Sequence, residues 1–261
     1  MNYHIDTIPL WDALKLDSEC PLCIIQRHLE LQETEKFLGA SVMDPDTRVR
    51  VNDKGFCKAH QKMLITGNNR LGLALLMESH INKVKPALLG AVKTAKEEAA
   101  SKKPLRFGKN SQIKESLETE KEKLQAISRS CILCETLSAH MKRYIEGFVI
   151  LWKNDSQFRE AFAKSKGLCV EHIADCLEPA NKHLSGQQAE EFLRIIEELT
   201  EQNLARQEEE LKTFIKKFDY RNGDMPWGNS KDSVERMINR LQGWCVGQEP
   251  HPDDRNKDRK F

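Results

Sequence analysis

The stretch Cys20-Pro-Leu-Cys23, followed by Gly55-Phe-Cys57-Lys-Ala-His60, decides how this sequence can fold. The same pair returns later as Cys131-Ile-Leu-Cys134 and Gly167-Leu-Cys169-Val-Glu-His172. We call the first member of each pair the CxxC half-motif and the second the GxCxxH half-motif. A two-residue spacer lets two thiolates reach one metal ion, and it does the same for a thiolate and an imidazole at the start of a helix. The glycine would permit a tight turn before the second half-motif.

Identical residues recur at a constant spacing through the two halves of the chain. The pairs that share the first spacing are Cys20/Cys131, Cys23/Cys134, Phe37/Phe148, Asp44/Asp155 and Arg48/Arg159. Four further pairs are separated by one residue more than these: Lys54/Lys166, Gly55/Gly167, Cys57/Cys169 and His60/His172. A single register with one inserted residue therefore matches nine pairs. We interpret the halves as two copies of one unit, and we expect each copy to form the same helical subassembly.

Each copy contains the ligands for one zinc ion, because three cysteines and one histidine are a common set for a closed structural zinc site. We expect two zinc ions, each bound by the two half-motifs of the same copy. The predicted ligands of the first ion are Cys20, Cys23, Cys57 and His60, and those of the second are Cys131, Cys134, Cys169 and His172. The two half-motifs of a copy are further apart in the sequence than those of a small zinc finger. Each ion would therefore join two helices within a larger core.

Other chemistries of these cysteines are weaker alternatives. A CxxC at a helix start can act as a redox dithiol, because the helix dipole lowers the pKa of a thiol there. Redox chemistry gives no reason for a paired histidine, however, and the strands of a thioredoxin-like fold are missing. An iron-sulfur cluster held by three cysteines and one histidine is a minority alternative. Four protein ligands also argue against catalytic zinc, which keeps one position open.

The composition indicates a soluble cytosolic protein. The chain has 261 residues and a formal charge of +1, which predicts no polyanionic partner. We find no signal peptide and no apolar stretch long enough to span a membrane. In a reducing compartment, eight cysteines are expected to bind metal or do thiol chemistry rather than form disulfides. The basic stretch 83–114 leaves nucleic-acid binding as an alternative. Phe107 is the only aromatic residue within this stretch, so it offers no series of rings on which bases could stack, and we favour a solvated helix face.

The hydrophobic periodicity predicts an all-α fold of two related helical units, each pinned by a Cys3His site. We expect a first unit over residues 1–101, a linker over 102–112, a second unit with a C-terminal helix over 113–246, and a disordered tail over 247–261. Asp44, Asp155 and Ser185 are predicted helix caps, and Ser185 forms a capping box with Gln188. Asp232 and Glu235 repeat this pattern before the last helix.

Several other polar residues have structural interpretations. His80 lies on the apolar face of a long predicted helix and is expected to be a core histidine. Cys176 and Cys245 lie among apolar residues and are expected to pack there. The pairs Asp44/Arg48 and Asp155/Arg159 are expected to cap and pair within one helix turn, and their recurrence leaves open an arginine that faces a ligand.

The two half-motifs of the first copy and the following stretch Asn69-Arg-Leu-Gly-Leu-Ala-Leu75 resemble those of a bacterial family described as a domain of unknown function. The resemblance covers most of the chain. It implies the same plan of duplicated motifs and adds no mechanism.

We therefore expect a cytosolic zinc-binding helical protein that acts as a non-enzymatic binding or adaptor protein for a protein or small-molecule partner. The alternative from another class is a thiol-redox or metal-responsive regulator or enzyme that uses the CxxC pairs. Zinc that resists weak chelators and thiol reagents would favour the first interpretation, and a labile ion would favour the second.

Overall fold

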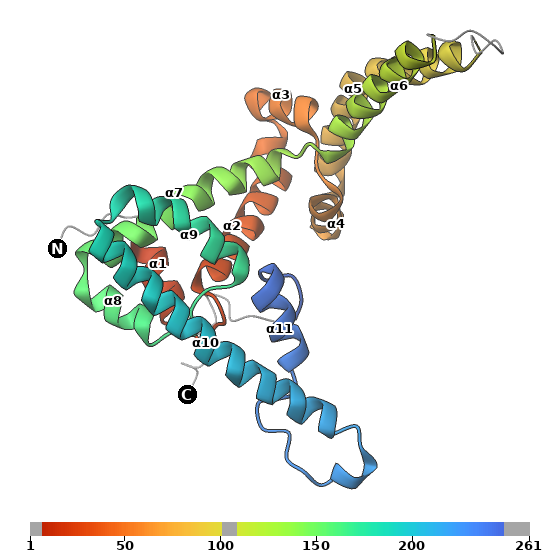
Figure 1. The fold of residues 1–261 in the computed structure, drawn as a ribbon. Helices are drawn as coiled ribbons and strands as arrows, with labels where there is room; N and C mark the ends of the chain where they lie inside the picture. Colours follow the sequence, from red (N-terminus) through yellow and green to blue (C-terminus); the bar gives the residue numbers. More distant parts are fainter. Residues whose placement is uncertain (1–6, 101–108, 248–261) are drawn as a thin grey trace. The chain divides into compact units, whose positions relative to one another are not determined.

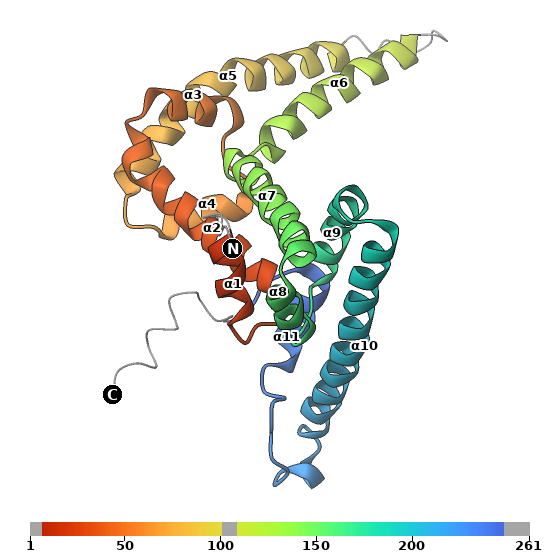
Figure 2. The same cartoon turned by 90° about the vertical axis from the view of Figure 1, so that its left-hand side faces the viewer.

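The computed structural model describes residues 7–100 and 109–247, and this part of the chain contains helices and no strands (Figures 1 and 2). The predicted all-α class is confirmed. Two short 3-10 turns, η2 (Ala40–Val42) and η3 (Tyr220–Asn222), accompany the α-helices. In chain order these are α1 (Ile8–Leu14), α2 (Pro21–Leu38), α3 (Pro45–Lys54), α4 (Lys58–Thr66), α5 (Arg70–Ala100), α6 (Lys109–Arg129), α7 (Ile132–Asn154), α8 (Ser156–Ala163), α9 (Val170–His183), α10 (Gly186–Lys216) and α11 (Ser233–Gln242).

The predicted helix caps form at three of the four positions. The Asp44 side chain accepts a hydrogen bond from the Thr47 amide, and Asp155 caps α8 in the same way. Ser185 and Gln188 form the reciprocal capping box at the start of α10. The capping box predicted at Asp232 is wrong, because this carboxylate accepts a hydrogen bond from the Arg236 side chain and makes no cap bond.

The chain divides into two compact units, which differ from the expected halves. Unit 1 comprises residues Met1–Leu29 and Ser138–Phe261, and unit 2 comprises Glu30–Leu137. The division falls inside α2 and α7, so each of these helices begins in one unit and ends in the other. Each helix that starts at a CxxC half-motif therefore begins in the unit that holds the long C-terminal helix of the other copy.

The expected linker and tail fall mostly outside the described residues. Of the linker 102–112, the part as far as residue 108 lies outside them, and the rest belongs to α6, which begins at Lys109. The expected tail lies outside them from residue 248.

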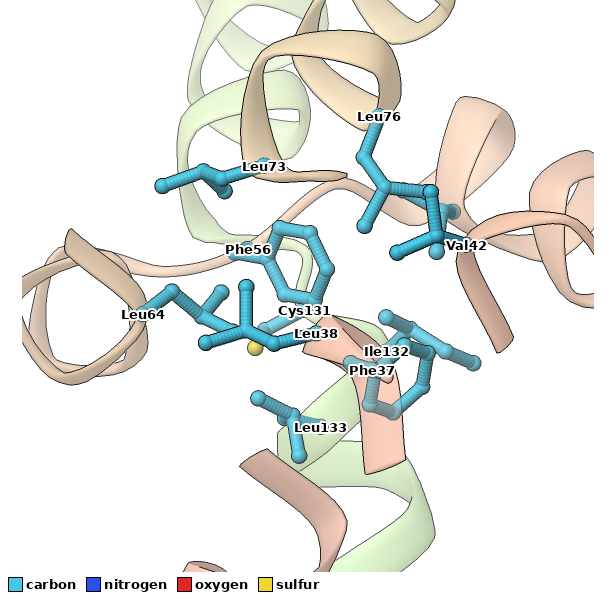
Figure 3. Packing of buried hydrophobic residues seen from close by; sticks show 11 residues of the cluster. Phe37, Leu38, Val42, Phe56, Leu64, Leu73, Leu76, Cys131, Ile132 and Leu133 are labelled. Atoms are coloured by element: carbon cyan, nitrogen blue, oxygen red, sulfur yellow. The ribbon is translucent and has the colours of Figure 1, made fainter. Parts of the chain in front are cut away.

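Unit 2 has an apolar core that includes the first residues of α7 (Figure 3). Phe37 and Phe56 pack edge to face with ring centroids 5.6 Å apart. Buried leucines from α4 and α5 surround them, and Ile132 and Leu133 enter the same cluster from α7. The start of α7 is therefore built into the core of unit 2.

Two hydrogen bonds hold this entry point of α7. The Ile132 amide donates to the Gly55 carbonyl, and the Ser130 hydroxyl donates to the Lys54 carbonyl. The long helices α5 and α6 lie side by side in the same unit (Figures 1 and 2).

Unit 1 has an aromatic core contributed by three helices. Phe148 of α7 lies 5.1 Å from both Phe158 and Phe162 of α8, measured between ring centroids. Trp152, one turn further along α7, lies 5.0 Å from Phe192 of α10. All five rings are buried, and edge-to-face packing of this kind adds stability beyond the buried area alone. This core fixes α7, α8 and α10, and α9 follows α8 in the same unit.

Across the described helices, none is both long enough and apolar enough to cross a membrane.

Candidate metal centres

The eight predicted ligands lie in two groups, one in each unit. Cluster 1, in unit 1, consists of Cys20, Cys23, Cys169 and His172. Cluster 2, in unit 2, consists of Cys57, His60, Cys131 and Cys134. In each cluster the four ligand atoms lie within 4.8 Å of one another. The structure therefore has two Cys3His clusters that could hold a metal ion.

The pairing of half-motifs predicted within each copy is wrong. Cluster 1 joins the CxxC half-motif of the first copy to the GxCxxH half-motif of the second, and cluster 2 joins the other two. The physical reason is the path of α2 and α7, each of which starts in the unit that contains the other copy's GxCxxH half-motif. The two copies are thus interleaved, and each cluster ties together segments that are distant in the sequence.

The atomic distances in cluster 1 correspond to the edges of a tetrahedron around one ion. His172 Nδ1 lies 3.2 Å from the Cys169 sulfur and 3.5 Å from the sulfurs of Cys20 and Cys23. The sulfurs of Cys23 and Cys169 are 3.6 Å apart. Tetrahedral zinc with ordinary bond lengths gives edges of about 3.5 to 3.8 Å. The four ligand atoms therefore form a cage that could hold a single metal ion.

Cluster 2 has the same geometry. His60 Nδ1 lies 3.3 Å from the Cys57 sulfur, 3.2 Å from that of Cys131 and 3.4 Å from that of Cys134. The sulfurs of Cys57 and Cys134 are 3.7 Å apart. The other ring nitrogen, His60 Nε2, lies 3.3 Å from a carboxylate oxygen of Glu30. A carboxylate behind a ligating histidine orients the ring and increases its basicity.

The electrostatics of both clusters favour a positive charge at their centre. Burial alone would lower the pKa of His172, but the negative charge of Cys20 and the hydrogen bond to Cys169 raise it to about 11. Burial would likewise lower the pKa of His60, but its bonds to Cys131 and Glu30 raise it to about 10. Burial raises the pKa of the Cys131 thiol, yet the hydrogen bonds with His60 and with the backbone of Cys57 and Cys134 together lower it to about 6. A metal cation bound to these thiolates would neutralise their negative charge in the same way as the protonated histidine does.

The two clusters differ in their exposure to solvent. In cluster 1, Cys20, Cys23, Cys169 and His172 expose no more than 4% of their surface. In cluster 2, Cys134 is exposed and Cys57 is half-buried, although His60 and Cys131 are buried. Solvent therefore reaches two of the thiols in cluster 2 and none in cluster 1.

A buried charge network surrounds cluster 1. Arg240 of α11 is 2% exposed and donates to the carbonyls of Lys166 and Leu168, at 2.9 and 2.7 Å. The same guanidinium donates to Glu19 at 2.9 Å, and Glu19 is 3% exposed. Glu19 precedes Cys20, and Leu168 precedes Cys169, so Arg240 connects the backbone next to one half-motif to a side chain next to the other. Gln207 of α10 also donates to Glu19, at 3.1 Å.

Arg240, Gln207 and Glu19 are site residues that the sequence did not predict. Arg240 and Gln207 are distant from any cysteine motif in the sequence, and on amphipathic helices they resemble ordinary surface residues. The one signal was the position of Glu19 next to Cys20, because a carboxylate in a buried half-motif requires a cationic partner.

The glycines of both GxCxxH half-motifs have a backbone conformation that other residues rarely adopt. Gly55 has φ +61° and Gly167 has φ +83°, which confirms the tight turn expected at these positions. A Cβ atom at position 55 would lie 2.5 Å from Nε2 of His80. His80 is itself fixed, because its Nδ1 lies 2.8 Å from the Asn52 carbonyl oxygen. His80 is therefore a half-buried histidine that has a hydrogen-bond partner and lies outside the clusters, whereas the sequence predicted a core position.

The substitution Gly55→Ala is expected to destabilise the protein by about 1 to 3 kcal/mol, because it strains the backbone and collides with His80. Urea unfolding of the metal-loaded protein measures this effect. The matched control is Gly90→Ala within α5, where no atom lies within 4 Å of the added Cβ. Alanine there should stabilise the helix by roughly 0.5 to 1 kcal/mol. Equal effects of the two substitutions would show that the turn before Cys57 does not need glycine.

Two of the predicted structural residues have different environments from those expected. Cys176 is fully buried, as predicted, whereas Cys245 is exposed, so the packing role predicted for Cys245 is wrong. The predicted pairing of Arg48 with Asp44 is also wrong, because Arg48 donates to the Leu75 carbonyl.

Arg159, the repeat equivalent of Arg48, likewise makes contacts other than the predicted one. It donates to the Trp152 and Lys153 carbonyls, and its guanidinium lies over the Trp152 ring. Both arginines therefore connect neighbouring helices.

Comparison with known proteins gives one family match. A sequence model described as "Family of unknown function (DUF6062)" matches residues 1–248 and therefore includes both clusters. No curated protein and no solved structure matches the chain.

Proposed function

The chain belongs to the DUF6062 family, and we propose that it is a zinc-binding helical protein with a non-enzymatic binding or adaptor role. The observation that carries this proposal is the closed ligand set of cluster 1. All four of its ligands are protein side chains, and all four are buried. Structural zinc sites have this form, whereas catalytic sites keep a position for water or substrate.

The proposed metal is zinc because of the ligand types and the size of the cage. Three thiolates and one imidazole are a soft set that zinc accepts in tetrahedral geometry. In an iron-sulfur cluster the cysteines bind different iron atoms, so their sulfurs need not surround one point. The close approach of the sulfurs of Cys57 and Cys134, at 3.7 Å, and of Cys23 and Cys169, at 3.6 Å, supports a single ion in each cluster.

The proposed role of the ions is to hold together segments that are distant in the sequence. Cluster 1 joins the start of α2 to the start of α9, and cluster 2 joins the start of α4 to the start of α7. Each pair comes from different copies of the repeat. Because the unfolded chain has no preformed site, the free energy of binding the ion contributes to the stability of the fold.

The binding or adaptor role is supported by apolar side chains that the units leave in solvent. Leu88, Leu89 and Val92 on α5 expose between 39% and 57% of their surface. Such residues are available to a protein partner or a small molecule. We place the protein in the cytoplasm, because six thiolates that bind metal need a compartment that keeps thiols reduced.

Metal analysis of the full-length protein, purified without added metal or chelator, tests the proposed function. We expect two zinc ions per chain, one for each cluster. Removing them with a strong chelator under denaturing conditions, and returning the chain to buffer without zinc, should leave it without the cooperative unfolding transition. A protein that is isolated without zinc, or that unfolds identically with and without it, would contradict the proposal.

A further inference from the structure

We propose that cluster 2 is an oxidation-sensitive zinc switch, in which a hydroperoxide converts Cys134 and Cys57 to a disulfide and releases the ion, while cluster 1 keeps its ion. This inference rests on the proposed function, since both clusters must bind zinc. It assigns a regulatory activity to one cluster only, and it names the two thiols that react.

The solvent exposure of the thiols indicates that cluster 2 reacts before cluster 1. A hydroperoxide must reach a sulfur atom to react with it, and the most reactive cysteines of proteins are partly exposed thiolates. Cys134 is exposed, and zinc binding keeps its sulfur in the thiolate form. The thiolates of cluster 1 expose at most 4% of their surface. A dissolved oxidant therefore meets Cys134 before it meets any cysteine of cluster 1.

The distance between sulfur atoms indicates which thiol reacts with the oxidised Cys134. The sulfur of Cys57, the other partly accessible thiol of cluster 2, lies 3.7 Å from the sulfur of Cys134. A disulfide has a sulfur–sulfur separation of about 2.05 Å, so a small movement of the two side chains completes the bond and removes two ligands from the ion. Cys131, the third thiol of cluster 2, is buried and contacts His60. Cys57 is therefore the thiol best placed to react with an oxidised Cys134.

The reaction proceeds in two steps. The Cys134 thiolate attacks one oxygen of the hydroperoxide, the O–O bond breaks, and a sulfenic acid forms as the leaving alkoxide or hydroxide takes a proton from water. The Cys57 thiolate then attacks the Cys134 sulfur, the S–S bond forms, and the expelled hydroxide is protonated to water. The two thiolates supply two electrons to one hydroperoxide. The ion loses two of its four ligands and leaves as Zn²⁺.

The surroundings of cluster 1 protect it from the same reaction. Arg240 binds next to both half-motifs of the cluster, through the Leu168 carbonyl and the Glu19 carboxylate. In cluster 2, the Lys54 carbonyl accepts a hydrogen bond from the hydroxyl of Ser130. Ser130 directly precedes Cys131 as Glu19 directly precedes Cys20, so the two residues are equivalent in the repeat. The copies have therefore diverged at this position, with a neutral hydroxyl in cluster 2 and a buried carboxylate with an arginine partner in cluster 1.

The expected consequence is confined to unit 2. The disulfide keeps the start of α4 tied to α7, because Cys57 precedes α4 and Cys134 lies in α7. His60 and Cys131 lose the ion but stay close to their former positions. A thiol reductant and zinc should therefore restore the original cluster without refolding of the chain.

The test uses the full-length zinc-loaded protein and a titration with hydrogen peroxide. A chromogenic zinc chelator measures the released ion, and mass spectrometry of peptides maps the disulfide. We expect release of one of two ions, a disulfide between Cys57 and Cys134, and release from cluster 2 at least about tenfold faster than from cluster 1. The variant Cys245→Ser is the matched control, because it removes an exposed thiol outside both clusters, and it should release zinc as the wild-type protein does.

The possible failures are distinguishable. Two ions that leave at the same rate, or oxidation of Cys20, Cys23 or Cys169 before Cys134, would overturn the inference and leave the proposed zinc binding intact. Two ions that both stay bound at peroxide concentrations that oxidise Cys245 would overturn it as well. A chain that contains no zinc before treatment would overturn the proposed function and this inference together.

Discussion

Replacing Cys169 with serine is expected to reduce the zinc content from two ions to one and to unfold unit 1. Cys169 is 1% exposed and belongs to the buried cluster. Structural zinc contributes an apparent binding free energy on the order of 10 kcal/mol, which is comparable with the whole stability of an ordinary domain. Hydrogen exchange measures the effect separately in each unit. We expect rapid exchange in α8 and α9 of unit 1, and preserved protection in α3 and the first half of α5 in unit 2.

The matched control for this variant is Cys245→Ser. Cys245 is exposed and belongs to neither cluster, so its substitution should leave both the zinc content and the exchange rates unchanged. A Cys169→Ser protein that keeps two ions and the protection of α9 would show that cluster 1 does not bind zinc through this residue.

Replacing Arg240 with methionine is expected to destabilise the protein by about 3 to 5 kcal/mol. The substitution preserves much of the side-chain volume, but it leaves the buried Glu19 carboxylate with fewer positive partners and removes the donor to the Leu168 and Lys166 carbonyls. Urea unfolding of the zinc-loaded protein measures the difference. The stability of Arg240→Lys should lie between those of wild type and Arg240→Met, because an ammonium keeps the charge but cannot reproduce the fork of the guanidinium.

The control for Arg240→Met is Arg194→Met on α10. Arg194 forms an exposed ion pair with Glu198, one helical turn away. Exposed pairs of this kind contribute little, so the free energy of unfolding should change by less than about 0.5 kcal/mol. If Arg240→Met destabilised the protein no more than this control does, the buried network would have no role in holding cluster 1.

Local sequence signals predicted the helices well because each signal acts within a few residues. Asp44 followed by Pro45 predicted the start of α3, and Ser185 with Gln188 predicted the capping box of α10. The prediction failed at Asp232, where Arg236 one turn later competes for the carboxylate. The constant spacing of the cysteines predicted the eight residues that the structure brings together.

The assignment of half-motifs to clusters could not be predicted from this sequence. The two copies have the same ligand types at the same spacing, so either CxxC half-motif is chemically suited to either GxCxxH half-motif. The choice depends on where α2 and α7 cross from one unit to the other, which is a property of the packed cores. The exposure of Cys134 and the burial of Arg240 have the same origin, because both are set by neighbours that are distant in the sequence.

The central claim is that each cluster joins half-motifs from different copies, and zinc analysis of two double variants tests it most directly. The variant Cys20→Ser/Cys169→Ser changes cluster 1 alone and should keep one zinc ion, whereas Cys20→Ser/Cys57→Ser changes both clusters and should keep none. Pairing within each copy requires the opposite result. A Cys20→Ser/Cys57→Ser protein that retains one ion, together with a Cys20→Ser/Cys169→Ser protein that retains none, would contradict the account.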